Sequence, residues 1–360
     1  MLALKHISLY NFKNYGNQSF DFDKRVIGIY GNNGAGKTNL LDAIHYLCFT
    51  RSYFSRQDNQ HVHHGGDGFR IEGQIAYYGK EEKAVCIFRE TGKKEFLVNG
   101  AAYDKFSLHI GRYPCVVIAP DDSALITGDS RERRAFTDEL LSQLNQDYLQ
   151  QLIIYKKVLE QRNSLLRSFG ESGRTDFSLL EVLDEQLVRS GVQLFEKRRE
   201  FMIDFLPLVK HFYQDIARKN EEPALLYESD LIQTPMKELL AINRQKDCLA
   251  QRTTAGAHKD DIDIRLGDMP FKNIASQGQR KSLLFSMKLA EMELLKKEKH
   301  FAPLLLLDDV FEKLDEDRIS NLLHKVCVEN DGQVFITDTH RERLELHLQQ
   351  LNVPFQLIGL

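Results

Sequence analysis

The stretch Gly31-Asn32-Asn33-Gly34-Ala35-Gly36-Lys37-Thr38 matches the phosphate-loop pattern G-x-x-x-x-G-K-[ST] at every fixed position. An apolar run, Val26–Tyr30, precedes it, and a helical pattern over residues 38–47 follows it, as the motif requires. The glycines let backbone N–H groups wrap phosphates, and the helix N-terminus adds partial positive charge. We therefore expect this loop and Asn39 to bind ATP, with Lys37 on the β- and γ-phosphates and Thr38 on Mg²⁺.

A second motif combines a buried strand with acidic residues. Four leucines, Leu304–Leu307, are followed directly by Asp308 and Asp309. Ligands of open α/β sheets lie at the carboxyl ends of strands, so both carboxylates are expected beside the phosphate loop. Asp308 is expected to hold Mg²⁺, through water. Asp309 stands where ABC ATPases usually have a Glu that polarises the attacking water, and Asp reaches one methylene less far.

A third motif opens a long helical pattern. Ser276-Gln277-Gly278-Gln279 resembles the ABC signature S-G-G-Q, with Gln277 in place of the first glycine. In ABC ATPases this segment contacts the γ-phosphate held by the other subunit of a dimer, so Ser276 is expected to act in trans. Leu314-Asp315-Glu316 resembles the D-loop at that dimer interface. After a last buried strand, Val334–Thr337, ABC ATPases often have a His that senses the γ-phosphate; His340 is either this sensor or a surface residue, and Thr339 could equally occupy the position.

The order of these motifs predicts a discontinuous α/β domain. Strand patterns dominate up to about residue 118, including an Asn99-Gly100 hairpin turn, and they return at about residue 250. Residues 129–220 are instead charged and helix-periodic, with an interruption near 168–173. We expect an ABC-type P-loop ATPase head formed by residues 1–120 and 250–360, and an inserted helical arm over residues 121–249.

The composition constrains the cellular compartment and the partners expected for the protein. The 360 residues carry a net charge of −4, so any contact with nucleic acid must come from local patches. The five cysteines are widely spaced and form no CxxC pair, which favours a reduced, cytosolic compartment. The sequence holds no apolar run long enough to span a membrane, and its first residues do not resemble a secretory signal. We expect a cytoplasmic protein with no membrane partner.

Further segments carry a resemblance to one family. Five blocks resemble the RecF family, an SMC-like branch of the ABC ATPases, in the right order along the chain: Leu9–Tyr15, Pro120–Asp122 with Arg131–Asp138, Gly256–Asp261, Ser276–Gln279, and Leu307–Phe311. Lys13 replaces the usual Arg of the first block. It would lie near the nucleotide, or it is a solvated loop lysine.

The resemblance implies an activity and partners. Two heads would close around two ATP molecules as an ATP-dependent homodimer with Mg²⁺, and the dimer would hold single-stranded DNA or gapped duplex. Slow, weakly DNA-stimulated hydrolysis would release it. The implied roles are recombinational repair, replication support and the SOS response, with RecR and RecO as partners. Arg131, Arg133 and Arg134 form a basic cluster that would contact DNA or be a solvated face.

Alternatives remain at this point. A transporter ATPase subunit shares the three nucleotide motifs, but the long helical stretch between Lys37 and Ser276 favours the SMC-like branch. Other SMC-like proteins usually carry long coiled coils or a CxxC zinc hook, which this chain lacks. A nucleotide-controlled clamp, in which ATP binding alone captures DNA, also fits the aspartate at position 309. Loss of turnover with retained DNA binding in Asp309→Asn would identify it.

Overall fold

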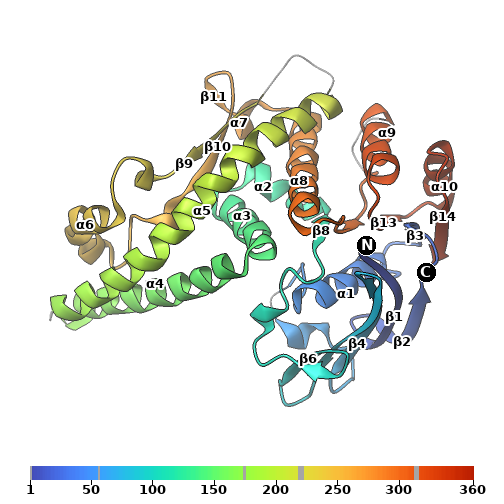
Figure 1. The fold of residues 1–360 in the computed structure, drawn as a ribbon, viewed down its shortest axis with the longest axis horizontal. Helices are drawn as coiled ribbons and strands as arrows, with labels where there is room; N and C mark the ends of the chain where they lie inside the picture. Colours follow the sequence, from blue (N-terminus) through green and yellow to red (C-terminus); the bar gives the residue numbers. More distant parts are fainter. Residues whose placement is uncertain (1, 56, 173–175, 218–222, 312–315) are drawn as a thin grey trace. The chain divides into compact units, whose positions relative to one another are not determined.

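A computed structural model describes residues 2–360 except 56, 173–175, 218–222 and 312–315. The chain divides into two compact units (Figure 1). The first comprises Met1–Asp122, Phe212–Arg218 and Gln277–Leu360, and the second comprises Ser123–His211 and Lys219–Ser276. The first unit resumes at Gln277, whereas the sequence placed the return to the head at residue 250.

A five-stranded parallel sheet lies in the first unit, in the order β14-β3-β13-β12-β8. Its strands are β3 (Val26–Tyr30), β8 (Cys115–Ile118), β12 (Leu304–Leu307), β13 (Val334–Asp338) and β14 (Phe355–Gly359). The middle strands are buried along their length, as their continuous apolar sequences predict. Because the strands are parallel, the carboxyl ends of β3, β12 and β13 meet at one edge.

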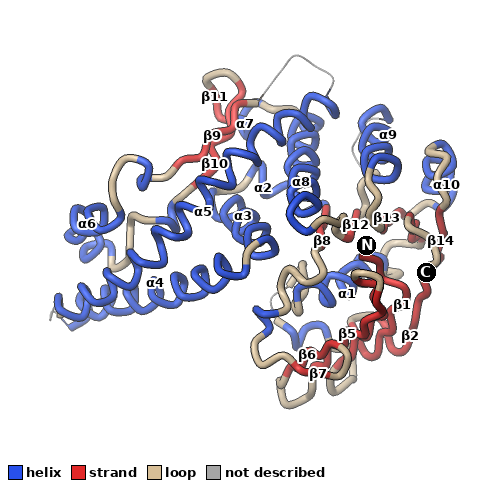
Figure 2. Tube along the Cα trace, in the orientation of Figure 1, coloured by secondary structure: helices blue, strands red, loops and turns tan. Residues whose placement is uncertain are grey.

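A six-stranded antiparallel sheet completes this unit, in the order β2-β1-β4-β5-β6-β7 (Figure 2). It contains β1 (Leu2–Phe12), β2 (Tyr15–Asp21), β4 (Phe69–Tyr77), β5 (Lys80–Phe88), β6 (Lys94–Val98) and β7 (Ala101–Ala102). The predicted Asn-Gly turn joins the last two strands, with φ of 52° at Asn99 and 84° at Gly100. Helix α1 (Lys37–Phe49) packs against both sheets, so its apolar side chains join one core.

Three further helices of the first unit alternate with the C-terminal strands of the parallel sheet, with α8 before β12, α9 after β12 and α10 after β13. They are α8 (Gln277–Lys299), α9 (Glu316–His324) and α10 (Arg341–Gln350), with a π-helical turn η6 (Lys325–Glu329). Three 3₁₀ turns complete the N-terminal part, η1 (Asp58–His61), η2 (Phe106–Leu108) and η3 (Pro120–Ser123).

The second unit combines helices with a small sheet. Its helices are α2 (Ala124–Thr127), α3 (Ser130–Leu144), α4 (Gln146–Ser172), α6 (Met236–Ala250) and α7 (Phe271–Ile274). The long helix α5 (Phe177–Ala217) belongs to it up to His211. The turns η4 (Asp230–Ile232) and η5 (Ala257–Lys259) flank a three-stranded sheet, β11-β10-β9: β9 (Ala224–Glu228), β10 (Asp261–Leu266) and β11 (Met269–Pro270).

One difference from the sequence-based expectation concerns this unit. Strand β9 lies inside the stretch expected to be helical, because it pairs antiparallel with β10 and so depends on a distant segment. The helices before it do break where the sequence pattern is interrupted, with α4 ending at Ser172 and α5 starting at Phe177. Among the described residues, no helix is both long and apolar enough to cross a membrane.

Candidate functional site

The phosphate loop lies between β3 and α1, at the carboxyl edge of the parallel sheet. Gly34 and Gly36 have φ values of 83° and 119°, which L side chains rarely adopt, so glycine is favoured at both. Helix α1 starts at Lys37, and no side chain caps its N-terminus. Backbone N–H groups there are therefore open to an anion. The Lys37 side chain is 4% exposed, and its Nζ donates to the carbonyls of Gly31 (2.8 Å) and Asn32 (3.2 Å).

Asp308 follows β12 and joins the loop to the sheet. The Thr38 hydroxyl donates to Asp308 Oδ2 at 2.8 Å, so the two motifs lie side by side as expected. Thr337 at the end of β13 donates to Asp308 Oδ1, also at 2.8 Å. Burial raises the pKa of Asp308, and the hydrogen bonds from the two threonines partly offset this. A hydroxyl and a carboxylate are hard oxygen ligands of the kind Mg²⁺ prefers, so Thr38 and Asp308 fit that cation.

Asp309 has an unusual backbone. Its φ of 44° lies in the left-handed region, and its N–H donates to Thr337 Oγ1 at 2.9 Å. Its side chain is half-buried beside Asp308, at the sheet edge that carries the phosphate loop. An acid in this place can position a water molecule next to a phosphate bound on the loop.

The turn between β1 and β2 braces the phosphate loop. Asn14 Nδ2 donates to the Ala35 carbonyl (2.9 Å), and the Tyr15 hydroxyl donates to the Gly36 carbonyl (3.0 Å). Asn39 donates to Asn14 Oδ1 (2.7 Å), so Asn39 supports the loop from within α1. Motif reasoning missed Asn14 and Tyr15 as loop contacts, although both belong to the block Leu9–Tyr15.

Lys13 is held by a buried acid. Its Nζ lies 2.6 Å from Oδ2 of Asp42, one turn beyond Thr38 in α1. Asp42 also accepts from the Ser52 hydroxyl (2.7 Å) and the Tyr53 N–H (2.8 Å). Lys13 is thus half-buried and paired with Asp42 rather than solvated, and its place near the nucleotide stays a prediction. Asp42 carried no sequence signal, because an acid inside a helix is ordinary.

The segment after β13 presents both candidates for phosphate sensing. His340 is exposed at the N-cap of α10, and Thr339 is half-buried, with its hydroxyl 2.8 Å from His340 Nδ1. Beside them Asp338 is buried and paired with Arg343, whose Nε donates to Oδ2 at 2.8 Å. Burial raises the pKa of Asp338, but the hydrogen bonds from Arg343 and from the His340 and Thr339 backbone, together with the Arg343 charge, hold the pKa below its usual value.

The signature-like segment lies where the two units join in sequence. Ser276 is the last residue of the second unit and is exposed, and Gln277, Gly278 and Gln279 form the first turn of α8. A Cβ at Gly278 would lie 2.3 Å from Nη1 of Arg318 in α9, so a larger residue there would require the flexible Arg318 side chain to move. Of the D-loop candidate, Leu314 and Asp315 lie outside the described residues.

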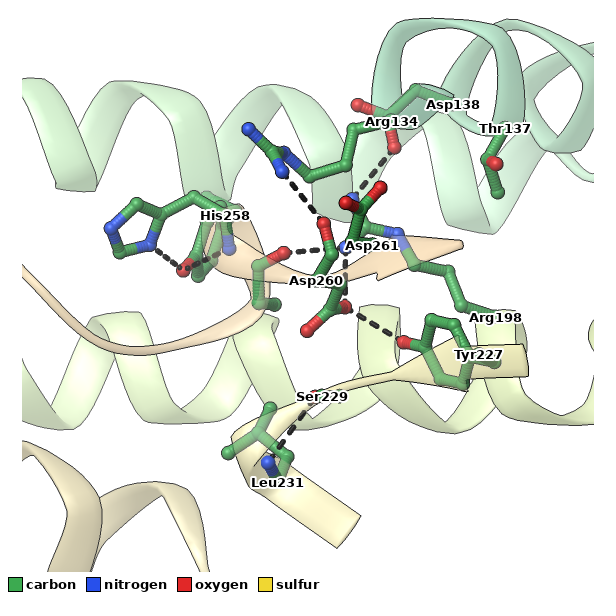
Figure 3. Close-up of polar contacts among 12 residues, drawn as sticks. Arg134, Thr137, Asp138, Arg198, Tyr227, Ser229, Leu231, His258, Asp260 and Asp261 are labelled. Atoms are coloured by element: carbon green, nitrogen blue, oxygen red, sulfur yellow. Dashed lines mark hydrogen bonds and ion pairs between the residues drawn. The ribbon is translucent and has the colours of Figure 1, made fainter. Parts of the chain in front are cut away.

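The candidate DNA-binding arginines have different environments. Arg133 is buried and forms a bidentate ion pair with Asp261, at 2.7 and 2.9 Å. Arg134 is half-buried and donates to the Asp260 carbonyl at 2.6 Å (Figure 3). Only Arg131 of the three is exposed. The segments Arg131–Asp138 and Gly256–Asp261, both of which carry the family resemblance, thus contact each other in the fold.

Arg198 of α5 completes this buried polar network. Its guanidinium donates to Asp138 Oδ1 (2.8 Å) and Asp260 Oδ2 (2.7 Å), and Tyr227 donates to the same Asp260 oxygen at 2.7 Å (Figure 3). Burial raises the pKa of Asp138, but the charges of Arg198 and Lys156 and the hydrogen bonds from Tyr148 and Arg198 together hold the pKa below its usual value. The network ties α3, α5, β9 and the start of β10 together.

Comparisons with known proteins agree with this architecture. Residues 3–356 match the family described as RecF/RecN/SMC N terminal domain. The chain is 42% identical over 359 residues to the DNA replication and repair protein RecF of Flavobacterium johnsoniae, with 100% of both chains covered. The corresponding protein of Parabacteroides distasonis is 40% identical over 356 residues, covering 99% of this chain and 96% of that one.

Solved structures give the same result. The recombination mediator protein RecF of the RecFOR pathway, solved as RecF-ATPrS, matches with a TM-score of 0.87 at 30% identity, covering 94% of this chain and 93% of that one. An Smc head domain from Pyrococcus furiosus matches with a TM-score of 0.55 at 17% identity, covering 96% and 92%, which shows a shared fold. The chain therefore belongs to the RecF family of the RecF/RecN/SMC proteins and has their ABC-type ATPase head.

Proposed function

We propose that this chain is an ATP-dependent DNA-binding protein of recombinational repair and replication support, which closes as a dimer on DNA and hydrolyses ATP slowly. The observation that carries the proposal is the 2.8 Å hydrogen bond between Thr38 and Asp308. It joins the phosphate loop to the acidic strand end, which lie far apart in the sequence. Curated relatives over the full chain are DNA replication and repair proteins, which supports the biological role.

The head binds ATP through residues of the phosphate loop. Backbone N–H groups of Gly31–Gly36 and of the first turn of α1, with Asn39 behind them, cradle the phosphates. Lys37 is already directed into the loop by two carbonyls, so its ammonium group is positioned for the β- and γ-phosphates. Lys13 supports the same region through its ion pair with Asp42 of α1.

Hydrolysis is in-line attack of water on the γ-phosphate. Mg²⁺, held by Thr38 and Asp308, would neutralise charge on the phosphate oxygens. Asp309 positions the water, and the short aspartate side chain accounts for slow turnover. Ser276, with Gln277, Gly278 and Gln279, contacts the γ-phosphate of the partner head in a C2 dimer. The exposure of Ser276 and Gln277 supports this role.

DNA binding follows dimer closure in this proposal. A net charge of −4 requires that contacts with DNA be local, and Arg131 is the exposed member of the arginine cluster. The substrates are single-stranded DNA and gapped duplex, which stimulate turnover weakly. A structural relative belongs to the RecFOR pathway, so RecR and RecO proteins are the partners proposed here. The setting is the cytoplasm, without a membrane partner.

The test is a DNA mobility shift with and without ATP–Mg²⁺, run beside light scattering for mass. We expect ATP to produce both a dimer and a DNA complex, and Lys37→Ala to abolish both. Lys197→Ala, which removes an exposed lysine of α5, is the matched control and leaves both intact. A chain that dimerises with ATP but never shifts DNA would refute the DNA-binding role while leaving the ATP-binding head in place.

A further inference from the structure

Thr337 is a buried hydroxyl in a strand of the parallel sheet. It follows the fully buried Val334, Phe335 and Ile336 in β13 and is itself 0% exposed. A hydroxyl in such a place costs free energy unless it is hydrogen-bonded, and valine would fit the strand equally well. We therefore expect the Oγ1 atom of Thr337 to form hydrogen bonds that valine could not.

The Oγ1 atom of Thr337 contacts both acidic residues that follow β12. It donates its single proton to Asp308 Oδ1 at 2.8 Å and accepts the N–H of Asp309 at 2.9 Å. Because Asp308 Oδ1 offers no hydrogen and the Asp309 amide offers only a hydrogen, the direction of both bonds is set. One oxygen atom thus fixes the carboxylate of Asp308 and the backbone of Asp309 together.

The backbone of Asp309 needs such support. Its φ of 44° is in the left-handed region, which Asp adopts more readily than most residues other than glycine but still at some cost in free energy, so contacts such as this one help to hold it. The hydrogen bond to Thr337 holds the amide at this point. The same backbone conformation sets the direction in which the Asp309 side chain leaves the chain.

The hydrogen bond from Thr337 to Oδ1 of Asp308 determines where the other carboxylate oxygen, Oδ2, points. Oδ2 accepts from Thr38, the proposed Mg²⁺ ligand, so Thr337 holds the carboxylate in the rotation that presents Oδ2 to the phosphate loop. The neighbouring Asp338 is engaged elsewhere, with Arg343, and does not compete for this role.

We infer that Thr337 is a positioning residue for ATP hydrolysis, which holds Asp308 and Asp309 in their working geometry through one hydroxyl. The inference rests on the proposed ATPase function. Thr337 touches neither nucleotide nor water in this role; it acts through the two acids. Its loss is therefore expected to affect turnover and not ATP binding, since binding relies on Lys37 and the loop backbone.

The experiment compares Thr337→Val, which keeps the shape and removes the hydroxyl, with Thr337→Ser, which keeps the hydroxyl. Steady-state kinetics should show kcat reduced about tenfold in T337V, with KM for ATP within about twofold. T337S should stay within about threefold of the native kcat. Thr137→Val is the matched control, because Thr137 is equally buried but lies in the second unit and donates to the Arg133 carbonyl.

Three outcomes would overturn the inference. The first is a native kcat in T337V. The second is a kcat of T337S as low as that of T337V, which would indicate that packing and not the hydroxyl matters. The third is a raised KM of T337V with unchanged kcat. If T337V does not fold, Thr337→Cys replaces it, and a kcat of T337C equal to that of T337S overturns the inference. Absence of turnover in the native chain refutes the ATPase function itself, whereas native turnover with an unaffected T337V refutes only the role of Thr337.

Discussion

The Nζ atom of Lys13 and the Oδ2 atom of Asp42 lie 2.6 Å apart, and the Asp42 side chain is fully buried. This ion pair joins the turn after β1 to the helix that carries the phosphate loop. Removing one partner of a buried pair leaves an unpaired charge, which is costly. We expect a double-mutant cycle of Lys13→Met and Asp42→Asn to give a coupling free energy of about 1–2 kcal/mol in urea unfolding.

The matched control is the pair Lys197–Glu200 on α5, whose side chains are mostly exposed. Its cycle should give a coupling below about 0.5 kcal/mol, because water screens surface ion pairs. Equal coupling in the two cycles would show that the Lys13–Asp42 pair does not hold the turn to α1.

Substitutions of Arg133 and Arg131 should differ in their effect on the free energy of unfolding, although the two residues are close in the sequence. Arg133→Ala leaves Asp261 unpaired and is expected to lower the free energy of unfolding by about 2–3 kcal/mol. Arg131→Ala removes an exposed side chain and should change it by less than about 0.5 kcal/mol. Urea unfolding followed by circular dichroism measures both. A smaller effect for Arg133 than for Arg131 would contradict a structural role for the ion pair.

Asp309→Asn separates ATP binding from turnover. The variant keeps the side-chain size and the backbone N–H bonded to Thr337, but it loses the charge that orients water. We expect kcat to fall about 100-fold or more, with ATP affinity within about threefold. Single-turnover hydrolysis and binding of a fluorescent ATP analogue give the two values.

The same variant distinguishes a hydrolysing enzyme from a clamp controlled by ATP binding alone. ATP-dependent DNA binding that survives in Asp309→Asn, while turnover is lost, would identify the clamp mechanism. Normal turnover in this variant would remove Asp309 from the catalytic assignment.

Local motifs located the loop and the acidic strand end along the chain. The loop Gly31–Thr38 and the strand Leu304–Leu307 were recognisable because their backbone conformations depend on residues next to one another. Thr38 and Asp308 lie within hydrogen-bond distance of each other, since parallel strands bring their carboxyl ends together.

Contacts between distant segments were not predictable in the same way. Thr337 reaches Asp308 only because β13 pairs in register with β12, with Leu307 opposite Ile336. Arg133 was a candidate for DNA because a charge cluster in a sequence does not reveal its partners. Its pairing with Asp261 depends on how α3 packs against β10, which no spacing rule encodes.

His258 should make stability depend on pH. Burial lowers its pKa to about 4, and its ring accepts from Tyr155 and donates to the Thr253 carbonyl. The unfolded chain, with an ordinary pKa near about 6.5, takes up a proton between pH 6.5 and 4 that the folded chain does not. Stability contributed by neutral His258 is therefore present above pH 6.5 and lost as the pH falls toward 4.

The measurement compares the native chain with His258→Gln in urea at pH 7 and pH 5. The native chain should lose about 1–2 kcal/mol more than the variant over this interval. His109 is also buried, with a pKa lowered to about 4. Because it is present in both proteins, its contribution cancels in the difference between their unfolding free energies. Parallel pH curves would show that His258 does not titrate as its burial requires.

Gly36 and Gly34 should respond differently to alanine, although both have positive φ. A Cβ at Gly36 would lie 2.6 Å from Asn14 Nδ2 and 2.7 Å from the Tyr15 hydroxyl, whereas one at Gly34 would meet nothing within 4 Å. Gly34→Ala therefore incurs only backbone strain, of about 1–2 kcal/mol. Gly36→Ala adds a collision with the two side chains that brace the loop.

We expect Gly36→Ala to weaken binding of an ATP analogue at least about tenfold more than Gly34→Ala, equivalent to about 1.4 kcal/mol. Adding Asn14→Ala and Tyr15→Phe to Gly36→Ala removes the two nearest colliding atoms, while the ring Cζ of residue 15 at 2.9 Å and the strain at φ 119° remain. Partial recovery of affinity in this triple variant is the expected result, because only part of the cost is relieved. No recovery would mean that the strain dominates, and equal affinities of the two single variants would show that the turn does not brace the loop.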